Sequence, residues 1–137
     1  MSQKEHLKYQ IENLKREIEA IKKNQIEAIK KDIEQEKRRI DEVKVQIFGL
    51  RNRKKEEADN FRRRLKNAKT RNQKESIRAA KIREWDRIGD GLERYKSRLR
   101  KLRERIQWHK GKITDLKERI SYKRNQISDR RESIRRL

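Results

Sequence analysis

The chain has 137 residues and a net charge of +21, with 49% charged and 30% hydrophobic residues. It contains no cysteine, which excludes a disulfide framework and a cysteine metal site. No apolar run approaches the roughly 18 residues of a membrane span, and residues 1–6 do not form a secretory signal. We therefore expect an intracellular protein, or one packed inside a virion.

The first predicted helix begins at about residue 3, because Ser2 and Glu5 form a capping box. The apolar phase slips within residues 22–25 and then resumes. The step from Ile18 to Ile29 is eleven residues, which is a stutter in the heptad and not a break. We expect one helix to continue through it with locally altered winding. Its apolar seam is Leu7, Ile11, Leu14, Ile18, Ile21, Ile26, Ile29, Ile33, Ile40, Val43, Ile47 and Leu50.

Residues 51–83 are far more basic than residues 1–50. They hold 14 Lys/Arg against four Asp/Glu, whereas residues 1–50 hold 12 against ten. The apolar stripe thins here, and the polar stretch 67–76 is the best turn candidate. Either Asn72 with Glu75 or Thr70 with Gln73 could cap the helix that follows.

Gly89-Asp90-Gly91 is a competing break, since glycine can end a helix and Asp90 can cap the next one. A break there and at Gly49 would give three helices. A third arrangement has helices that pair only between molecules. Against the break, the apolar phase stays in register across it, so we prefer a kink at 89–91.

The last stretch, 85–137, carries the clearest heptad repeat. Five of its eight d positions and all eight a positions are apolar, as in the seam of a coiled coil. The a positions are Trp85, Leu92, Leu99, Ile106, Ile113, Ile120, Ile127 and Ile134, and the d positions are Ile88, Tyr95, Leu102, His109, Leu116, Lys123, Arg130 and Leu137.

These patterns predict one all-α unit spanning 1–137, an antiparallel coiled-coil-like hairpin of long helices. Helix 1 covers about 3–66, the turn about 67–76 and helix 2 about 77–137. We expect kinks near Gly49 and Gly89–Gly91, with a break at 89–91 left open.

Catalytic and metal-binding patterns are absent from the sequence. The two histidines, His6 and His109, are 103 residues apart, and His109 falls on the seam. No serine has a base placed beside it, and no glycine-rich phosphate loop is present. We therefore expect no enzyme activity, no metal, no cofactor and no small-molecule substrate.

Trp108 and Tyr122 both fall at the c position, two heptads apart and off the seam. Packing against a second copy is our preferred interpretation, which predicts a homo-oligomer. The alternatives are a rim aromatic that folds over the seam, or stacking on a base or sugar.

The basic excess indicates a polyanionic partner, because a solvated helix needs no such imbalance. We expect a protein that binds nucleic acid without sequence specificity, DNA in preference to RNA, and forms a nucleoprotein assembly of chromosomal or viral nucleocapsid type. The rival is a structural or adaptor hairpin with an acidic protein partner; a membrane-surface helix is disfavoured because the narrow stripe is needed for helix pairing. The predicted nucleic-acid-binding residues are Arg51, Arg53, Lys54, Lys55, Arg62, Arg63, Arg64, Lys66, Lys69, Arg71, Lys74 and Arg78.

Overall fold

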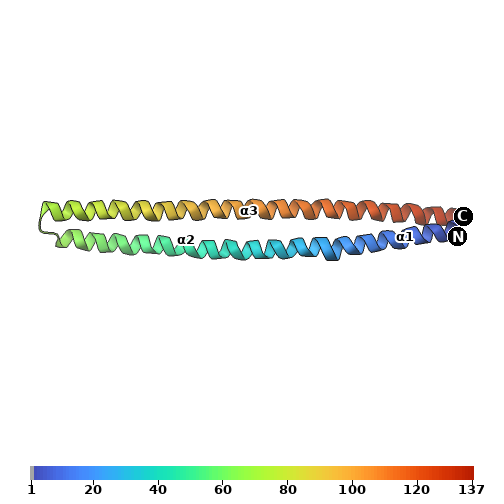
Figure 1. Cartoon of the computed structure of the whole chain (residues 1–137), viewed down its shortest axis with the longest axis horizontal. Coiled ribbons are helices and arrows are strands. Elements are labelled where there is room, and N and C mark those ends of the chain that lie inside the picture. Colours follow the sequence, from blue (N-terminus) through green and yellow to red (C-terminus); the bar gives the residue numbers. More distant parts are fainter. Residues whose placement is uncertain (1) are drawn as a thin grey trace. The chain divides into compact units, whose positions relative to one another are not determined.

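The structure, a computed structural model, describes residues 2–137 and is all-α (Figure 1). Its elements are α1 (Gln3–Ala20), the π-helix η1 (Ile21–Ile26), α2 (Glu27–Asn67) and α3 (Arg71–Arg136). The predicted class, a helical hairpin of two long helical runs packed against each other, is confirmed. The first run is α1, η1 and α2 together, and the second is α3.

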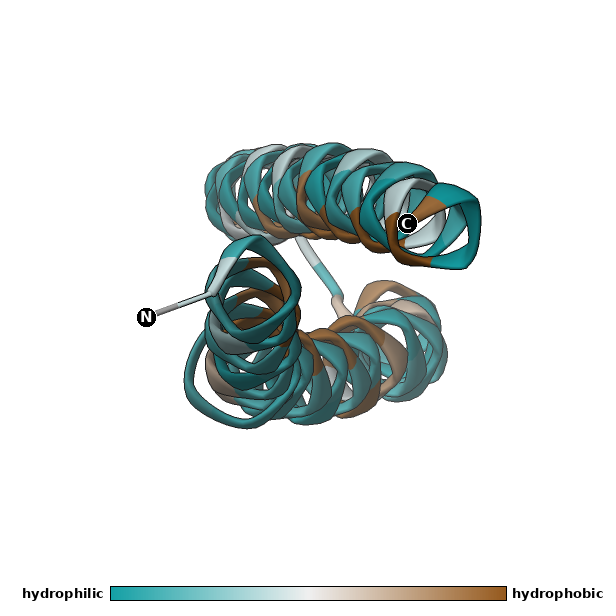
Figure 2. Cartoon of the chain, turned by 90° about the vertical axis from the view of Figure 1, so that its right-hand side faces the viewer, coloured by the Kyte–Doolittle hydropathy of each residue, from teal (hydrophilic) through white to brown (hydrophobic). Residues whose placement is uncertain are grey.

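Residue contacts group the chain into two compact units. Unit 1 combines the residues up to Glu36 with Arg105–Leu137, and unit 2 is Lys37–Glu104. In each unit, part of the first helical run lies antiparallel to part of α3. Figure 2 looks onto the chain ends, and the apolar sides of the two ribbons face each other there while their outer sides are polar.

The heptad seam of α3 is confirmed almost position by position. All eight a residues are buried or half-buried, and so are the d residues except Leu137, which is exposed. Lys123 and Arg130 are half-buried at d, and each reaches the opposite helix of unit 1. Lys123 Nζ donates to Glu17 Oε2 at 2.8 Å, and Arg130 Nε donates to Gln10 Oε1 at 3.0 Å.

The predicted stutter is a π-helix. Ile21 and Ile26 bound η1 and are both buried, although they are five residues apart. At about 100° per residue, an α-helix would point them about 140° apart. The i→i+5 hydrogen bonds of a π-helix widen the turn by one residue. This extra residue returns the seam to the interface, so the first helical run continues as predicted.

Two helix N-termini are capped by residues that the sequence analysis proposed. Ser2 Oγ accepts from the Glu5 amide at 3.2 Å. At the turn, Thr70 with Gln73 forms the capping box, and not Asn72 with Glu75. Thr70 Oγ1 accepts from the Gln73 amide at 3.2 Å, and Gln73 Oε1 accepts from the Lys69 amide at 2.8 Å and the Thr70 amide at 3.3 Å.

The predicted turn at 67–76 is too long. Only residues 68–70 lie between the helices, and α3 begins at Arg71 and not near 77. The reason is the Thr70–Gln73 box, which satisfies the free amide of Gln73 in the first turn of α3 and the amides of Lys69 and Thr70 just before it, so the helix begins at once. Periodicity alone assigns these residues to a loop, because the first turns of α3 are polar.

The break considered at 89–91 is wrong, because α3 is helical throughout Gly89-Asp90-Gly91. Gly49 likewise lies inside α2, and no glycine among the described residues has a positive φ. The kinks expected near Gly49 and Gly89–Gly91, which would bend the helix axis without ending the helix, remain predictions. Close packing accounts for the glycine at position 91, because a Cβ there would lie 3.1 Å from Leu50 Cδ1.

Candidate nucleic-acid interface

The twelve predicted nucleic-acid-binding residues all lie in unit 2, and every one of them is exposed. We call them the loop-end basic set. Unit 2 as a whole holds 25 Lys/Arg and 11 Asp/Glu, a net charge of +14, whereas unit 1 carries the remaining +7. The apolar core of unit 2 thins toward the turn, where Phe61 is the one buried residue within 51–83. This end of unit 2 therefore presents mostly cations to its surroundings.

Three members of the loop-end basic set form ion pairs. Arg62 pairs with Asp59 at 3.6 Å and Arg71 with Glu75 at 3.1 Å, both on exposed helix faces. Exposed pairs of this kind contribute at most about 1 kcal/mol and leave the cation accessible. The other nine form no ion pair with any residue in 2–137.

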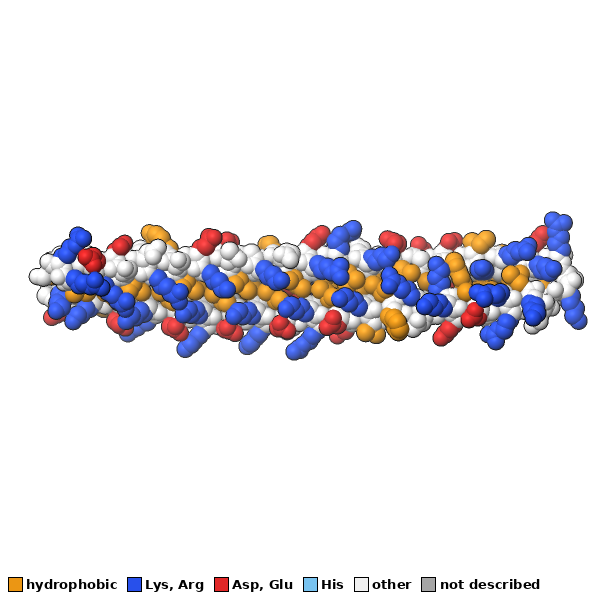
Figure 3. Space-filling view, turned by 180° about the vertical axis from the view of Figure 1, so that it is seen from behind, with side chains coloured by type: hydrophobic (Ala, Val, Ile, Leu, Met, Phe, Trp, Pro, Cys, Tyr) orange, Lys and Arg blue, Asp and Glu red, His pale blue; other side chains and the backbone are white. Residues whose placement is uncertain are grey.

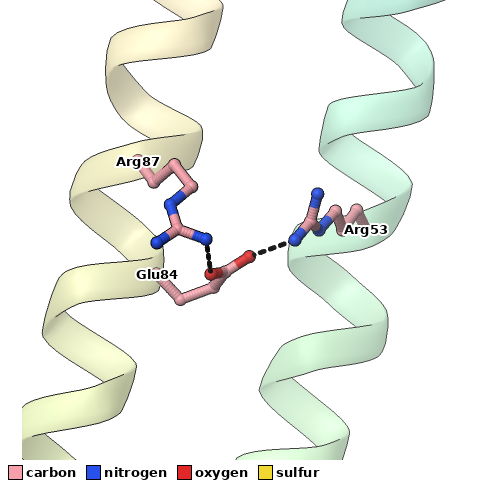
Figure 4. A network of polar contacts seen from close by, with 3 residues as sticks. All are labelled: Arg53, Glu84 and Arg87. Carbon is pink, nitrogen blue, oxygen red and sulfur yellow. Dashed lines mark hydrogen bonds and ion pairs between the residues drawn. The ribbon is translucent and has the colours of Figure 1, made fainter.

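Arg53 is the third, and it links the two helices of unit 2 (Figure 4). Its Nη2 donates to Glu84 Oε1 at 2.7 Å, and Arg87 Nη1 lies 3.6 Å from the other carboxylate oxygen. The Glu84 side chain is only 14% exposed. Two guanidinium groups therefore compensate one half-buried carboxylate, and Arg53 has a structural partner that the sequence did not predict.

Aromatic rings carry part of the cation array. Phe61 and Trp85 pack edge to face with ring centroids 5.9 Å apart. Lys54 Nζ and Lys81 Nζ lie 5.7 and 5.4 Å from the Trp85 ring, and the Arg64 guanidinium lies 5.3 Å from Phe61. Such contacts contribute about 0.5–1 kcal/mol at exposed sites. They hold the aliphatic stems against the helix pair and leave the charge outside.

Trp108 and Tyr122 are exposed, at 58% and 65%, as their off-seam position predicts. Lys112 Nζ covers the Trp108 ring at 3.9 Å. The contact with a second copy that we assigned to these two aromatics remains a prediction.

The sequence reasoning placed His109 on the seam but missed its partner, Glu36. Both are buried in unit 1: His109 Nδ1 lies 3.0 Å from Glu36 Oε2, and Arg105 Nε lies 3.5 Å from Glu36 Oε1. A carboxylate only accepts, so the histidine nitrogen is the donor. The signal was present in the sequence, because Glu36 continues the 3–4 spacing Ile33, Glu36, Ile40, Val43.

Sequence reasoning also missed two columns of cations that flank the seam. On α3, every e position from 96 to 131 is basic: Lys96, Arg103, Lys110, Lys117, Arg124 and Arg131. On the first helical run, the matching column is Lys8, Lys15, Lys22, Lys30, Lys37, Lys44 and Arg51. Its steps are seven residues except the eight from Lys22 to Lys30, which cross η1. The extra residue of the π-helix therefore keeps both the seam and the cations in phase.

Within unit 1 the two columns border the same groove. Lys15 and Lys22 line it from α1 and η1, and Arg124 and Arg131 from α3, above the buried side chains Ile18 and Ile127. Figure 3 shows this kind of arrangement, with Lys and Arg on both sides of an apolar strip and acidic residues toward the outer edges. We call Lys8, Lys15, Lys22, Lys30, Lys110, Lys117, Arg124 and Arg131 the groove cations.

No protein-family model, curated protein or solved structure matches the chain. Within residues 2–137, no group of three or more His, Cys, Asp or Glu is placed to hold a metal ion. None of the described helices is both long and apolar enough to cross a membrane. The assignment of a function therefore depends on the distribution of charge.

Proposed function

We propose that this protein binds the phosphate backbone of nucleic acid without reading its sequence. The observation that carries the proposal is the loop-end basic set: twelve exposed cations, nine of them without an ion pair among the described residues. A surface this basic repels itself, and binding a polyanion removes that cost. Releasing the counterions of a phosphate backbone supplies the binding free energy.

The direction of these cations supports backbone contact over base reading. Arg62, Arg63 and Arg64 are consecutive in α2, so they point about 100° apart around the helix. Base reading needs a few side chains fixed on one face that enters a groove. Contact with phosphates needs only dense charge on a scaffold. We expect DNA to be preferred to RNA, in an assembly of chromosomal or viral nucleocapsid type.

The rival partner is an acidic protein, for which the chain would act as a structural or adaptor hairpin. Both partners are attracted by positive charge, so charge alone does not separate them. Their counterion behaviour does separate them, because a nucleic acid carries a condensed ion atmosphere and gives a steep linear salt dependence.

The test is fluorescence anisotropy with a labelled duplex over a salt series, using the full chain. We expect log affinity to fall linearly with log salt. Replacing Arg62, Arg63 and Arg64 with glutamine should reduce the slope by about 2.7 if each contacts one phosphate. A matched control replaces Arg16, Lys31 and Arg135, three exposed cations of unit 1, and should change the slope less.

Failure to bind the duplex at low salt would overturn the proposal. So would equal binding of poly-glutamate at the same concentration of charge, which would favour the acidic-protein rival. Circular dichroism of each variant checks that helicity is retained.

A further inference from the structure

The groove cations of unit 1 lie at positions where their charge does not stabilise the helix pair. In an antiparallel pair the e columns of the two helices flank one side of the seam, and here both columns are basic. Like charges at such positions destabilise the pair. Lys15 pairs only with Glu12 on its own helix and Lys30 only with Glu27. The remaining six have no ion pair within the described part of the chain, so the groove stays strongly positive.

The other side of the same seam has the opposite character. There Lys123 meets Glu17 at 2.8 Å, Arg130 meets Gln10 at 3.0 Å, and Arg105 approaches Glu36 at 3.5 Å, all across the helix pair. Unit 1 therefore links its helices by polar contacts on one side and leaves repelling cations on the other. Stabilisation of the helix pair explains the side with the polar contacts, but it does not explain the side with the groove cations.

The floor of the groove excludes a third helix as its natural occupant. The apolar residues that line it, Ile18 and Ile127, are each only 6% exposed. An amphipathic helix that docked there would bury almost no further apolar surface, and apolar burial is what stabilises such docking. What the groove offers is positive charge along both walls, with Glu19 as the one acidic residue lining it.

The dimensions favour a strand over a duplex. Seven residues of α-helix rise about 10.5 Å, so a column of four cations extends about 32 Å. A duplex turns once in about 34–36 Å, and each of its strands would face a straight groove for only part of that length. A single strand can follow both rows continuously and bring successive phosphates to Lys and Arg.

We propose that the groove of unit 1 binds single-stranded nucleic acid, with its phosphodiester chain running along the helix pair between the two rows of groove cations. This inference rests on the proposed function and deepens it, because it assigns the single-stranded form to a site separate from the loop-end basic set. Lys15, Lys22, Arg124 and Arg131 would carry the central contacts.

The experiment compares two full-length variants that lose the same charge. The groove variant is K15Q/K22Q/R124Q/R131Q. Its control is R16Q/K31Q/R135Q/R136Q, which removes four exposed cations of unit 1 that lie outside the groove. Anisotropy is measured with a labelled thymidine strand of about 20 nucleotides and a duplex of about 20 base pairs, each longer than the groove at 3.4 Å per nucleotide.

We expect the groove variant to lose at least tenfold more affinity for the strand than the control does. Its salt slope on the strand should fall by about 2.8, from four lost phosphate contacts. The two variants should lose similar affinity for the duplex. The groove variant should also unfold at a higher temperature than the wild type, because it relieves repulsion across the seam.

Equal losses of strand affinity in the two variants would overturn the groove site and leave the proposed function standing, provided that the wild-type chain binds the duplex. A groove variant that loses strand and duplex affinity equally would overturn the selectivity for a strand. Displacement of the strand by poly-glutamate at equal charge concentration would instead assign the groove to an acidic polypeptide. Absence of wild-type binding to either nucleic acid would overturn both proposals together.

Discussion

Glu36 and His109 form a buried hydrogen bond across the seam of unit 1, with 3.0 Å between Glu36 Oε2 and His109 Nδ1. Their side chains are 4% and 10% exposed. No buried side-chain polar atom among the described residues lacks a partner. A polar pair at seam positions weakens a helix pair relative to apolar residues but specifies its register. Pairing α2 with α3 one heptad out of register would place Leu102 or Leu116 at the level of Glu36, so the hydrogen bond to His109 would be lost.

The first prediction concerns this pair. Glu36→Leu or His109→Leu alone should destabilise the protein by roughly 3 kcal/mol, since each leaves a buried polar partner without its hydrogen bond. The double variant E36L/H109L should recover most of the loss and exceed either single variant. Urea unfolding followed by circular dichroism measures the three values. Glu42→Leu, at an exposed position of α2, is the control and should change stability by about 0.5 kcal/mol or less. Additive losses in the double variant would contradict the coupling.

The second prediction concerns the π-helix. Deleting Asn24 from η1 would reduce the step from Ile18 to Ile26 to seven residues. The segment should then become regular α-helix with the seam in phase, and thermal stability should stay the same or rise. Deleting Gln46 from the regular part of α2 is the matched control. That deletion rotates the following residues by about 100° and should lower the unfolding temperature strongly. Comparable destabilisation by both deletions would show that η1 does not absorb an extra residue.

The third prediction concerns the effect on stability of replacing three helical glycines with alanine. A Cβ at Gly49 or Gly89 would meet nothing within 4 Å. Alanine at either position should therefore stabilise its helix by about 1 kcal/mol, the propensity difference between the two residues. Gly91→Ala should give a smaller gain or a loss, because its methyl would lie 3.1 Å from Leu50 Cδ1. Thermal unfolding ranks the three variants, and a loss of stability at Gly49 or Gly89 would show that the glycine itself is required there.

The fourth prediction concerns the thin core beside the loop-end basic set. Phe61 is 4% exposed and packs against Trp85, whereas Phe48 is 66% exposed. Phe61→Ala should cost roughly 3 kcal/mol and raise amide exchange mainly in unit 2. Phe48→Ala, a matched loss of the same side chain, should cost less than about 0.5 kcal/mol. Uniform exchange throughout the chain in the Phe61 variant would indicate instead that the two units unfold together.

Local sequence patterns predict the two long helical runs and the irregular winding near Lys22. The heptad of 85–137, the Ser2 cap and the stutter near Lys22 are local patterns, since each depends on residues within one or two turns of one another. For the same reason, predictions from local patterns overestimate the effect of residues that can interrupt a helix. Periodicity predicts too long a turn, and the glycines allow a break at Gly89-Asp90-Gly91, because local propensity does not include the packing that keeps a helix intact.

The residues of different helices that share a surface are known only once the two helices are paired. The spacing places Glu36 on the seam of its own helix, but its partners His109 and Arg105 lie about 70 residues away and are identified only when the two helices are paired. The e column of α3 and the column Lys8, Lys15, Lys22 are each ordinary charged flanks when taken alone. The antiparallel pairing of unit 1 brings them to one groove, with η1 keeping Lys30 in phase, and it also decides that the other flank carries the polar links. Charge along one helix is a property of the sequence, whereas its accumulation between two helices depends on their direction and register.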